Sequence, residues 1–340
     1  MACSIQFIFR HPIPGFYSIE ELFQEYARSL SPDFSTECRT LPYPGTGFWN
    51  RCLNLWITWR HRPPGPGLTH ITGDVHYLAL VLPVRSTLLT IHDCTILQQT
   101  RGWRRWLIWF FWFYLPVRRL CYITVVSEET KRSLLEWVSV NPRKIHVIPN
   151  GLIGDFHPKT TPFQSELPTI LVVGTTPNKN LYRVIEALKI IPCQLCILGE
   201  LQPAQELALQ NARLSYTQKT GLNRAEVARV YSSCDFLLYP SLQEGFGLPI
   251  LEAQASGIPV ITSNLSAMPA TAGSGACFVD PYEVVEIQKA VVKVIRDAAY
   301  REGLVREGLE NLKRFSLGEI LKQYEQLYLE MLPSFSLPNH

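Results

Sequence analysis

The sequence carries little net charge for its length. Its 32 lysines and arginines stand against 29 aspartates and glutamates, which gives a formal charge of +3 at pH 7. No run of basic residues is long enough to follow a phosphate backbone, and nucleic-acid binding depends on such a surface. We therefore expect no nucleic-acid partner.

The sequence also lacks a zinc-type cysteine cluster and a recognisable secretory leader. Its nine cysteines are scattered, and only Cys193 and Cys196 lie close together, inside an apolar run. One such pair is half of a zinc site, so we expect buried thiols in a reducing compartment. Residues 1–10 show no basic segment followed by an apolar stretch and a cleavage site. The expected location is therefore the cytoplasm.

What the sequence does contain is an alternation of short apolar runs and helical patterns. With 46% hydrophobic residues over 340 positions, two domains are expected. Such runs, separated by helices, predict an α/β fold with parallel sheets. The expected strands are 5–9, 88–91, 122–126 and 145–148, followed by 170–173, 194–198, 236–239, 259–261 and 277–279.

A linker is expected between the two series of strands. Residues 155–168 are rich in proline, threonine and polar residues and show no apolar periodicity. This places a first domain at 1–157 and a second at 165–314. A final helix is predicted at 317–332, and the sequence leaves open whether it packs back onto the first domain.

The most informative stretch runs from residue 241 to residue 257. It follows the expected strand 236–239, and its glycines lie just before Pro249, which suits the first turn of a helix. Gly257 suits the C-terminal end of that helix. Ligands of open α/β sheets bind where such strands end, and free N–H groups at a helix N-terminus hold phosphate without a metal.

Glu244 and Glu252 are separated by about two helical turns, so two carboxylates can bind different hydroxyls of one extended ligand. The segment resembles the glutamate, seven residues, glutamate signature of retaining glycosyltransferase family 4. The resemblance implies the GT-B fold, two Rossmann-like domains whose parallel sheets face across a cleft. It also implies that Glu244 contacts the donor sugar and Glu252 the ribose, with Gly245, Phe246, Gly247 and Leu248 completing the donor-binding loop. Two solvated glutamates at a helix entry are the alternative.

A second loop that resembles the family follows the expected strand 170–173. Lys179 lies there before a helix, where its charge can meet a diphosphate. Family members usually add an arginine a few residues earlier, where this chain has Thr175 and Thr176. Lys179 is therefore expected to stabilise the leaving group, with Thr175 beside it. A surface lysine without a partner is the alternative.

The first domain contributes two further candidates. His92 and Asp93 end an apolar strand where family members carry a histidine facing the donor, so His92 is a candidate catalytic residue. A purely structural histidine is the alternative. Gly15, in the loop after the first strand, could approach the phosphates or the acceptor, and a plain turn explains it nearly as well.

Together these residues predict a hexosyltransferase. The donor is expected to be a nucleoside diphospho-sugar, with mannose suggested by family habit, and the acceptor a glycan or a lipid-linked glycan. No two aspartates are separated by one residue, so the usual metal-binding signature is missing and neither a metal nor another cofactor is expected. The alternatives are a sugar-nucleotide epimerase or hydrolase and a non-catalytic binding protein at a membrane.

Residues 106–115 form an almost wholly apolar, aromatic run that is too short to cross a bilayer as a helix. Tryptophans favour membrane interfaces, and arginines flank the run where anionic headgroups would lie. An anionic membrane surface or acceptor contact is one reading, and a buried helix or a homodimer contact is the other. The residues proposed for this surface are Arg105, Trp106, Trp109, Trp112 and Arg118.

Overall fold

The computed structural model describes residues 3–12, 18–62 and 67–332 and divides the chain into two compact units. The first unit is Met1–Gly151 with Leu317–His340, and the second is Leu152–Ser316. Residues 152–157, which the sequence assigned to the first domain, thus group with the second unit. The reason is local, because the carbonyl of Ile153 accepts a hydrogen bond from Arg224 and Phe156 packs against Tyr231.

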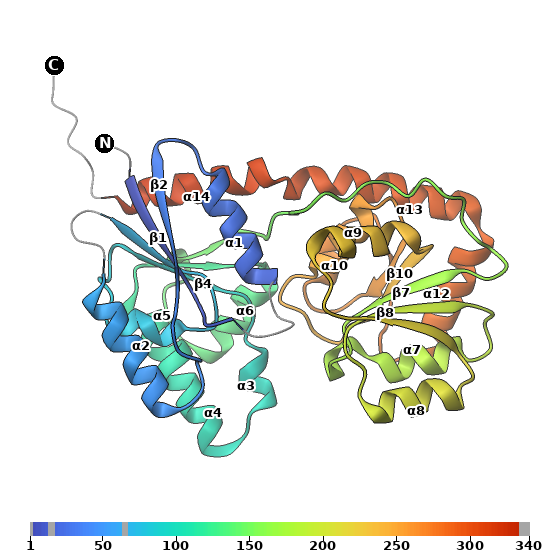
Figure 1. Cartoon of the computed structure of the whole chain (residues 1–340), viewed down its shortest axis with the longest axis horizontal. Coiled ribbons are helices and arrows are strands. Elements are labelled where there is room, and N and C mark those ends of the chain that lie inside the picture. Colours follow the sequence, from blue (N-terminus) through green and yellow to red (C-terminus); the bar gives the residue numbers. More distant parts are fainter. Residues whose placement is uncertain (1–2, 13–17, 63–66, 333–340) are drawn as a thin grey trace. The chain divides into compact units, whose positions relative to one another are not determined.

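The first unit contains a six-stranded parallel sheet with the order β2-β1-β3-β4-β5-β6 (Figure 1). Its strands are β1 (Cys3–Phe9), β2 (Phe34–Thr40), β3 (Leu68–Ile71), β4 (Thr87–Ile91), β5 (Tyr122–Val125) and β6 (Ile145–Val147). Its helices are α1 (Ser18–Ser29), α2 (Phe48–Arg60), η1 (His76–Leu80), α3 (Thr95–Gln99), α4 (Gly102–Ile108), η2 (Trp109–Tyr114), α5 (Leu115–Arg119), α6 (Glu128–Trp137), η3 (Pro142–Lys144) and α14 (Leu317–Met331).

The terminal helix α14 packs beside α1 in this unit (Figure 1). Tyr324 and Tyr328 of α14 are buried. The ring of His70 on β3 lies 2.7 Å from the hydroxyl of Tyr328 and 2.7 Å from the hydroxyl of Thr90. Burial lowers the pKa of His70 to about 3, so this polar contact under α14 is made by a neutral imidazole.

The second unit contains another six-stranded parallel sheet, with the order β12-β11-β10-β7-β8-β9. Its strands are β7 (Thr169–Val173), β8 (Gln194–Leu198), β9 (Ser215–Lys219), β10 (Phe236–Tyr239), β11 (Val260–Ser263) and β12 (Cys277–Val279). Its helices are η4 (Pro177–Lys179), α7 (Leu181–Leu188), α8 (Pro203–Asn211), α9 (Arg224–Ser233), α10 (Leu248–Ala255), α11 (Met268–Ala272), α12 (Val284–Arg296), α13 (Ala298–Asn311) and η5 (Leu312–Phe315).

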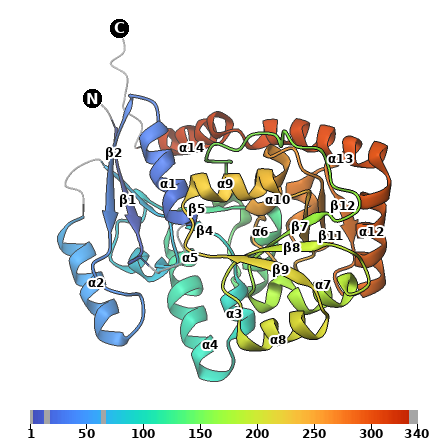
Figure 2. The same ribbon diagram turned by 45° about the vertical axis from the view of Figure 1, so that its right-hand side comes forward.

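Helices cover both faces of this second sheet. Ile170 and Val172 of β7 belong to one apolar cluster, whereas Leu171 between them belongs to another. The first cluster includes residues of α7, α8 and α12, and the other includes residues of α9, α10 and α11. Figure 2 shows α9 and α10 on one side of the sheet and α7 and α8 on the other. A doubly covered parallel sheet of this kind exposes its ligand-binding groups at its strand ends.

Cys193 and Cys196 are buried thiols before and within β8, as the sequence predicted. Within the described ranges, no helix combines the length and the apolar character that crossing a bilayer requires.

Candidate active site

The strand order of the second unit reverses between β7 and β10. From β7 the chain proceeds outward through β8 and β9, and it then returns to β10 on the other side of β7. The carboxyl ends of these two strands therefore flank a topological switch point, where α/β sheets bind ligands. Lys179 follows β7 and Glu244 follows β10. The two side chains form an ion pair, with Lys179 Nζ 2.6 Å from Glu244 Oε1.

The ion pair is held by neighbouring polar groups. Lys179 Nζ also donates to the hydroxyl of Tyr239 at 2.6 Å and lies over its ring. Asn178 Nδ2 donates to Glu244 Oε1 at 3.1 Å. Burial, and next to it the charge of Glu244, raise the pKa of Tyr239 well above its usual value, so the phenol stays protonated. The pair is mostly shielded but reaches solvent, since the side chains are 17% and 14% exposed.

The loop after β7 has a backbone shape that brings Lys179 inward. Gly174 has φ +83°, and a Cβ there would lie 2.9 Å from Lys179 Cε, so only glycine fits without displacing the lysine. Asn180 is left-handed, and its Nδ2 donates to the carbonyls of Pro240 and Pro281. The hydroxyl of Thr175 donates to the carbonyl of Glu200. Thr175 therefore secures the loop, and its predicted donor contact stays a prediction.

The glycine-rich loop after β10 leads into α10. Gly247 has φ +105° and precedes the first helical residue, Leu248, so the predicted helix entry is confirmed. Phe246 is buried against Phe315, and its carbonyl accepts from the Thr271 hydroxyl. Gly245 lies between Glu244 and this anchored residue. Because its ends are fixed, the loop presents backbone N–H groups at the N-terminus of α10.

Glu252 lies deeper than Glu244. Its Oε1 is 2.9 Å from Arg224 Nη1, and its Oε2 accepts from the hydroxyl of Tyr231 at 2.5 Å. Burial, followed by the charge of Glu252, keeps the pKa of Tyr231 well above its usual value. Both carboxylate oxygens thus have protein partners, and the predicted ribose contact of Glu252 stays a prediction. Arg224 was not predicted from the sequence, because its contact with Glu252 arises only when α9 packs beside α10.

His92 follows β4 of the first unit, at the strand end predicted for it. Its Nε2–H donates to the carbonyl of Thr72 at 2.8 Å, and burial lowers its pKa. Its ring packs edge-on against Phe23. The carboxylate of Asp93 accepts from the N–H of Thr95, the first residue of α3. Gly15 lies outside the described residues.

The tryptophans of the aromatic segment 106–115 differ in their contacts. Trp109 and Trp112 donate their indole N–H groups to the carbonyls of Trp137 and Asp74, at 2.8 and 2.7 Å. They are therefore anchored to the first unit while partly exposed, and their predicted membrane or acceptor contact stays a prediction. Trp106 is 55% exposed.

Two arginines of the predicted surface lie at the ends of this segment. Arg105 in α4 is exposed. The guanidinium of Arg118 is exposed and lies 5.5 Å from the ring centre of Tyr114.

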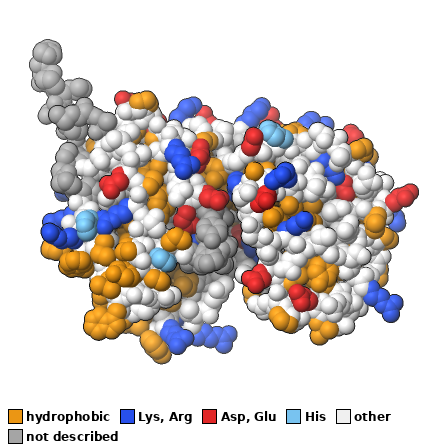
Figure 3. Space-filling view, viewed as in Figure 1, with side chains coloured by type: hydrophobic (Ala, Val, Ile, Leu, Met, Phe, Trp, Pro, Cys, Tyr) orange, Lys and Arg blue, Asp and Glu red, His pale blue; other side chains and the backbone are white. Residues whose placement is uncertain are grey.

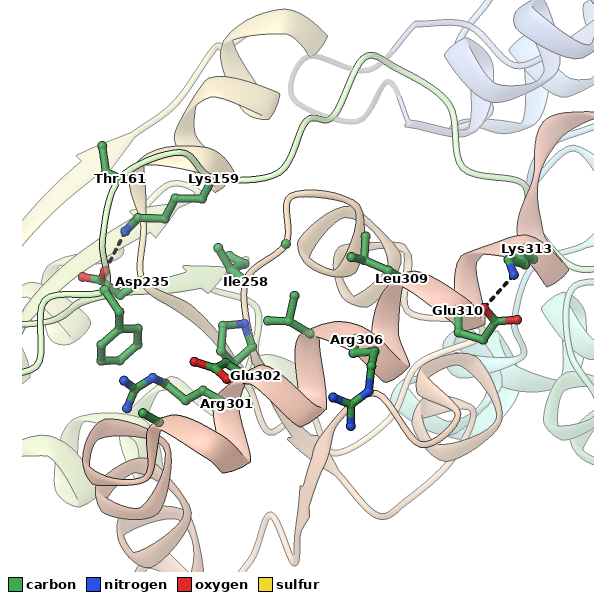
Figure 4. A pocket seen from close by; sticks show the side chains of 15 residues that line it. Lys159, Thr161, Asp235, Ile258, Arg301, Glu302, Arg306, Leu309, Glu310 and Lys313 are labelled. Atoms are coloured by element: carbon green, nitrogen blue, oxygen red, sulfur yellow. Dashed lines mark hydrogen bonds and ion pairs between the residues drawn. The ribbon is translucent and has the colours of Figure 1, made fainter.

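A cavity of about 690 Å³ opens at the other end of the second sheet (Figure 4). It lies beside Asp235 and Ile258, which precede β10 and β11, and is bordered by α13. Lys159 points to Asp235 there, at 2.6 Å. Because this is the amino-terminal edge of the sheet, the cavity is separate from the switch-point site. In the part of the chain described, no three His, Cys, Asp or Glu side chains are grouped to hold a metal ion.

Known structures share this two-unit architecture. Sucrose-phosphate synthase from Thermosynechococcus elongatus is 18% identical, with a TM-score of 0.78 over 97% of this chain and 99% of its own. HepE from Anabaena, crystallised with UDP and glucose, is 16% identical, with a TM-score of 0.75 over 96% of this chain and 100% of its own. The fold is therefore GT-B, as expected from the sequence.

Two family models match the sequence. The model for Glycosyltransferase Family 4 matches residues 39–153, and the model for Glycosyl transferases group 1 matches residues 167–297. The class of protein defined by this fold and these matches is a glycosyltransferase. Among glycosyltransferases, the chain belongs to family 4, group 1.

Curated relatives include two bacterial mannosyltransferases. O-antigen chain mannosyltransferase B of Escherichia coli is 30% identical over 43% of this chain and 42% of its own length. O-antigen chain mannosyltransferase RfbU of Salmonella typhimurium is 26% identical over 68% of each. The chain thus spans less than half of the first relative and about two thirds of the second.

Proposed function

We propose that this chain transfers a mannosyl group from a nucleoside diphospho-mannose to a growing glycan or lipid-linked glycan, with retention of the anomeric configuration and without a metal. The observation that carries the proposal is the ion pair of Lys179 and Glu244 at the switch point between β7 and β10. The mannosyl donor and the O-antigen type of acceptor are suggested by the names of the two bacterial relatives.

In the proposed mechanism, the two members of the Lys179–Glu244 ion pair bind different parts of the donor. Glu244 binds hydroxyls of the sugar, and Lys179 donates to the diphosphate as negative charge grows on it. The N-terminus of α10 adds N–H groups without a cation. Tyr239 keeps Lys179 in place when the substrate competes for its ammonium group.

Retention follows from attack on the face that the diphosphate leaves. The bond between the anomeric carbon and the phosphate oxygen breaks as the acceptor oxygen bonds to the same carbon, through an oxocarbenium-like state. The acceptor proton passes to the departing phosphate oxygen. His92 of the first unit stays a candidate catalytic residue in this proposal, and burial lowers its pKa, so its imidazole is neutral.

The working location proposed is the cytoplasmic face of a membrane, where lipid-linked acceptors are found.

The experiment that tests the function is a donor screen in EDTA. GDP-mannose, UDP-glucose and ADP-glucose are compared for their effect on thermal unfolding, since a ligand that binds only the folded chain raises its melting temperature. The stabilising donor is then incubated with glycan acceptors, and the product anomer is read by NMR. An inverted product, or a strict need for a divalent ion, would overturn the mechanism. Donor breakdown at full rate without acceptor would indicate a hydrolase.

A further inference from the structure

Helix α2 is built with its polar side chains inward. Asn54 and Thr58 are its buried residues. Asn54 Nδ2 donates to the carbonyl of Tyr43 at 2.9 Å and to the hydroxyl of Tyr77 at 3.3 Å. The helix therefore attaches to the first unit through these hydrogen bonds and through Leu55, which is partly buried against the core.

The aromatic residues of α2 and Leu53 face solvent. Trp49 is 77% exposed, Trp56 57% and Trp59 50%, and Phe48 and Leu53 are exposed beside them. Residues 49, 53, 56 and 59 follow the three- and four-residue spacing of one helix face. Figure 3 shows hydrophobic side chains gathered over α2, at the lower left of the first unit. Exposed aromatic patches of this kind mark interaction surfaces.

The surrounding sequence is strongly basic. Between Glu37 and Glu128 it contains ten arginines, no lysine and only two acidic residues, Asp74 and Asp93. This stretch carries a net charge of +8, whereas the whole chain carries +3. Arg60 and Arg62 lie at the end of α2, and both are exposed.

Helix α4 lies at the same lower end of the first unit in both ribbon views (Figures 1 and 2). Trp103 and Trp106 on it are 70% and 55% exposed. Arg104 and Arg105 beside them are also exposed. The first half of the aromatic segment thus adds to the surface, while Trp109 and Trp112 stay anchored to the first unit.

We propose that the exposed face of α2, formed by Phe48, Trp49, Leu53, Trp56 and Trp59, docks the first unit on an anionic lipid bilayer. Tryptophans prefer the interfacial layer, and the arginines around them attract anionic headgroups. The charge argues against a second copy as the occupant, because a symmetric contact through this face would join two helices that end in exposed Arg60 and contain no acidic side chain to offset it. This surface deepens the membrane location of the proposed function.

The test is co-sedimentation of the full chain with lipid vesicles. Vesicles of equal parts phosphatidylcholine and phosphatidylglycerol are compared with vesicles of phosphatidylcholine alone. We expect binding to the anionic vesicles, and we expect the triple variant Trp49→Ser, Trp56→Ser, Trp59→Ser to bind at least about tenfold more weakly. Bromine-labelled lipids should quench the tryptophan fluorescence of the wild type more strongly than that of the variant.

The matched control removes three exposed apolar side chains from the second unit: Ile190→Ser, Leu207→Ser and Val285→Ser. These residues are 71%, 57% and 55% exposed, and this variant should bind vesicles like the wild type. Equal thermal unfolding curves verify that the triple tryptophan variant is folded.

Three outcomes overturn the docking proposal. They are no binding of the wild type to anionic vesicles, equal binding of the tryptophan variant, and a concentration-dependent dimer that the tryptophan substitutions dissolve. Donor binding, measured without vesicles, separates the two proposals. A chain that binds vesicles but no nucleotide sugar refutes the proposed function and leaves docking standing, and the reverse result refutes docking alone.

Discussion

Replacing Glu244 by glutamine removes one charge and keeps the shape of the side chain. In the folded chain Glu244 Oε1 accepts from Lys179 Nζ at 2.6 Å and from Asn178 Nδ2 at 3.1 Å. The glutamine oxygen can still accept both bonds, and Lys179 keeps its bond to Tyr239. We therefore expect the Glu244→Gln chain to fold.

The expected loss lies in transfer. A hydrogen bond to a charged group contributes about 1.5–3 kcal/mol, and the substitution turns the sugar-binding carboxylate into a neutral acceptor. If that difference appears in the transition state, kcat/KM falls by about 10- to 150-fold. The loss of folding stability should be at most about 1 kcal/mol, because the ion pair reaches solvent and is partly screened.

The assay is a time course of acceptor mannosylation, with KM and kcat determined separately. Glu302→Gln, an exposed carboxylate on α13, is the matched control and should leave both constants unchanged. Thermal unfolding verifies the fold of each variant. A kcat/KM within about twofold of wild type for a folded Glu244→Gln chain would remove this residue from the site and refute the reasoning.

Three further predictions concern stability and geometry. Arg224→Met leaves the Glu252 carboxylate buried without its cation, so denaturant unfolding should show a loss of about 2 kcal/mol, partly regained when Glu252→Gln is added. Burial lowers the pKa of His70 from 6.5 to about 3, so the neutral ring stabilises the fold above pH 6.5. This stability is lost as the pH falls from 6.5 towards about 3. The free energy of unfolding should be lower by about 2 kcal/mol near pH 5 than above pH 6.5, and His70→Gln should weaken this pH dependence. Gly174→Ala should reduce transfer more than stability, because its Cβ displaces Lys179; equal activity at equal melting temperature would count against this.

Most strands could be predicted from the sequence, including the edge strands β6 and β12, whereas β2, β3 and β9 were missed. β7, β8 and β10 are buried on both faces and appear as continuous apolar runs. The edge strands β2 and β9 are mostly exposed and polar, so they give no such signal. β3 was missed for another reason: it is short, and half of it is the polar pair Thr69 and His70.

The polar residues of β3 are buried all the same. His70 contacts a hydroxyl of α14, which is 258 residues away in the sequence. A strand whose burial depends on so distant a partner cannot be predicted from its own residues.

The site residues that belong to a sequence motif could be predicted, because the motif specifies both the residue type and its place in the chain. Lys179 and Glu244 were expected to be near a diphospho-sugar, and the strand order brings them to 2.6 Å from each other. Arg224 and Tyr231 were not predicted, because their contacts with Glu252 arise only when α9 packs beside α10. Such partners follow from tertiary packing and leave no local pattern.

Helix α2 shows why an apolar periodicity does not by itself define a core face. The spacing of Trp49, Leu53 and Trp56 is that of an amphipathic helix, and in a water-soluble domain such a stripe normally packs inward. Here Asn54 takes the inward face, and its side-chain amide donates to the carbonyl of Tyr43 and the hydroxyl of Tyr77, two acceptors that an apolar side chain would leave unsatisfied. The outward stripe then has no partner among the described residues. A lipid surface would remove these rings from water and complement the arginines at once, which a neutral protein partner would not do.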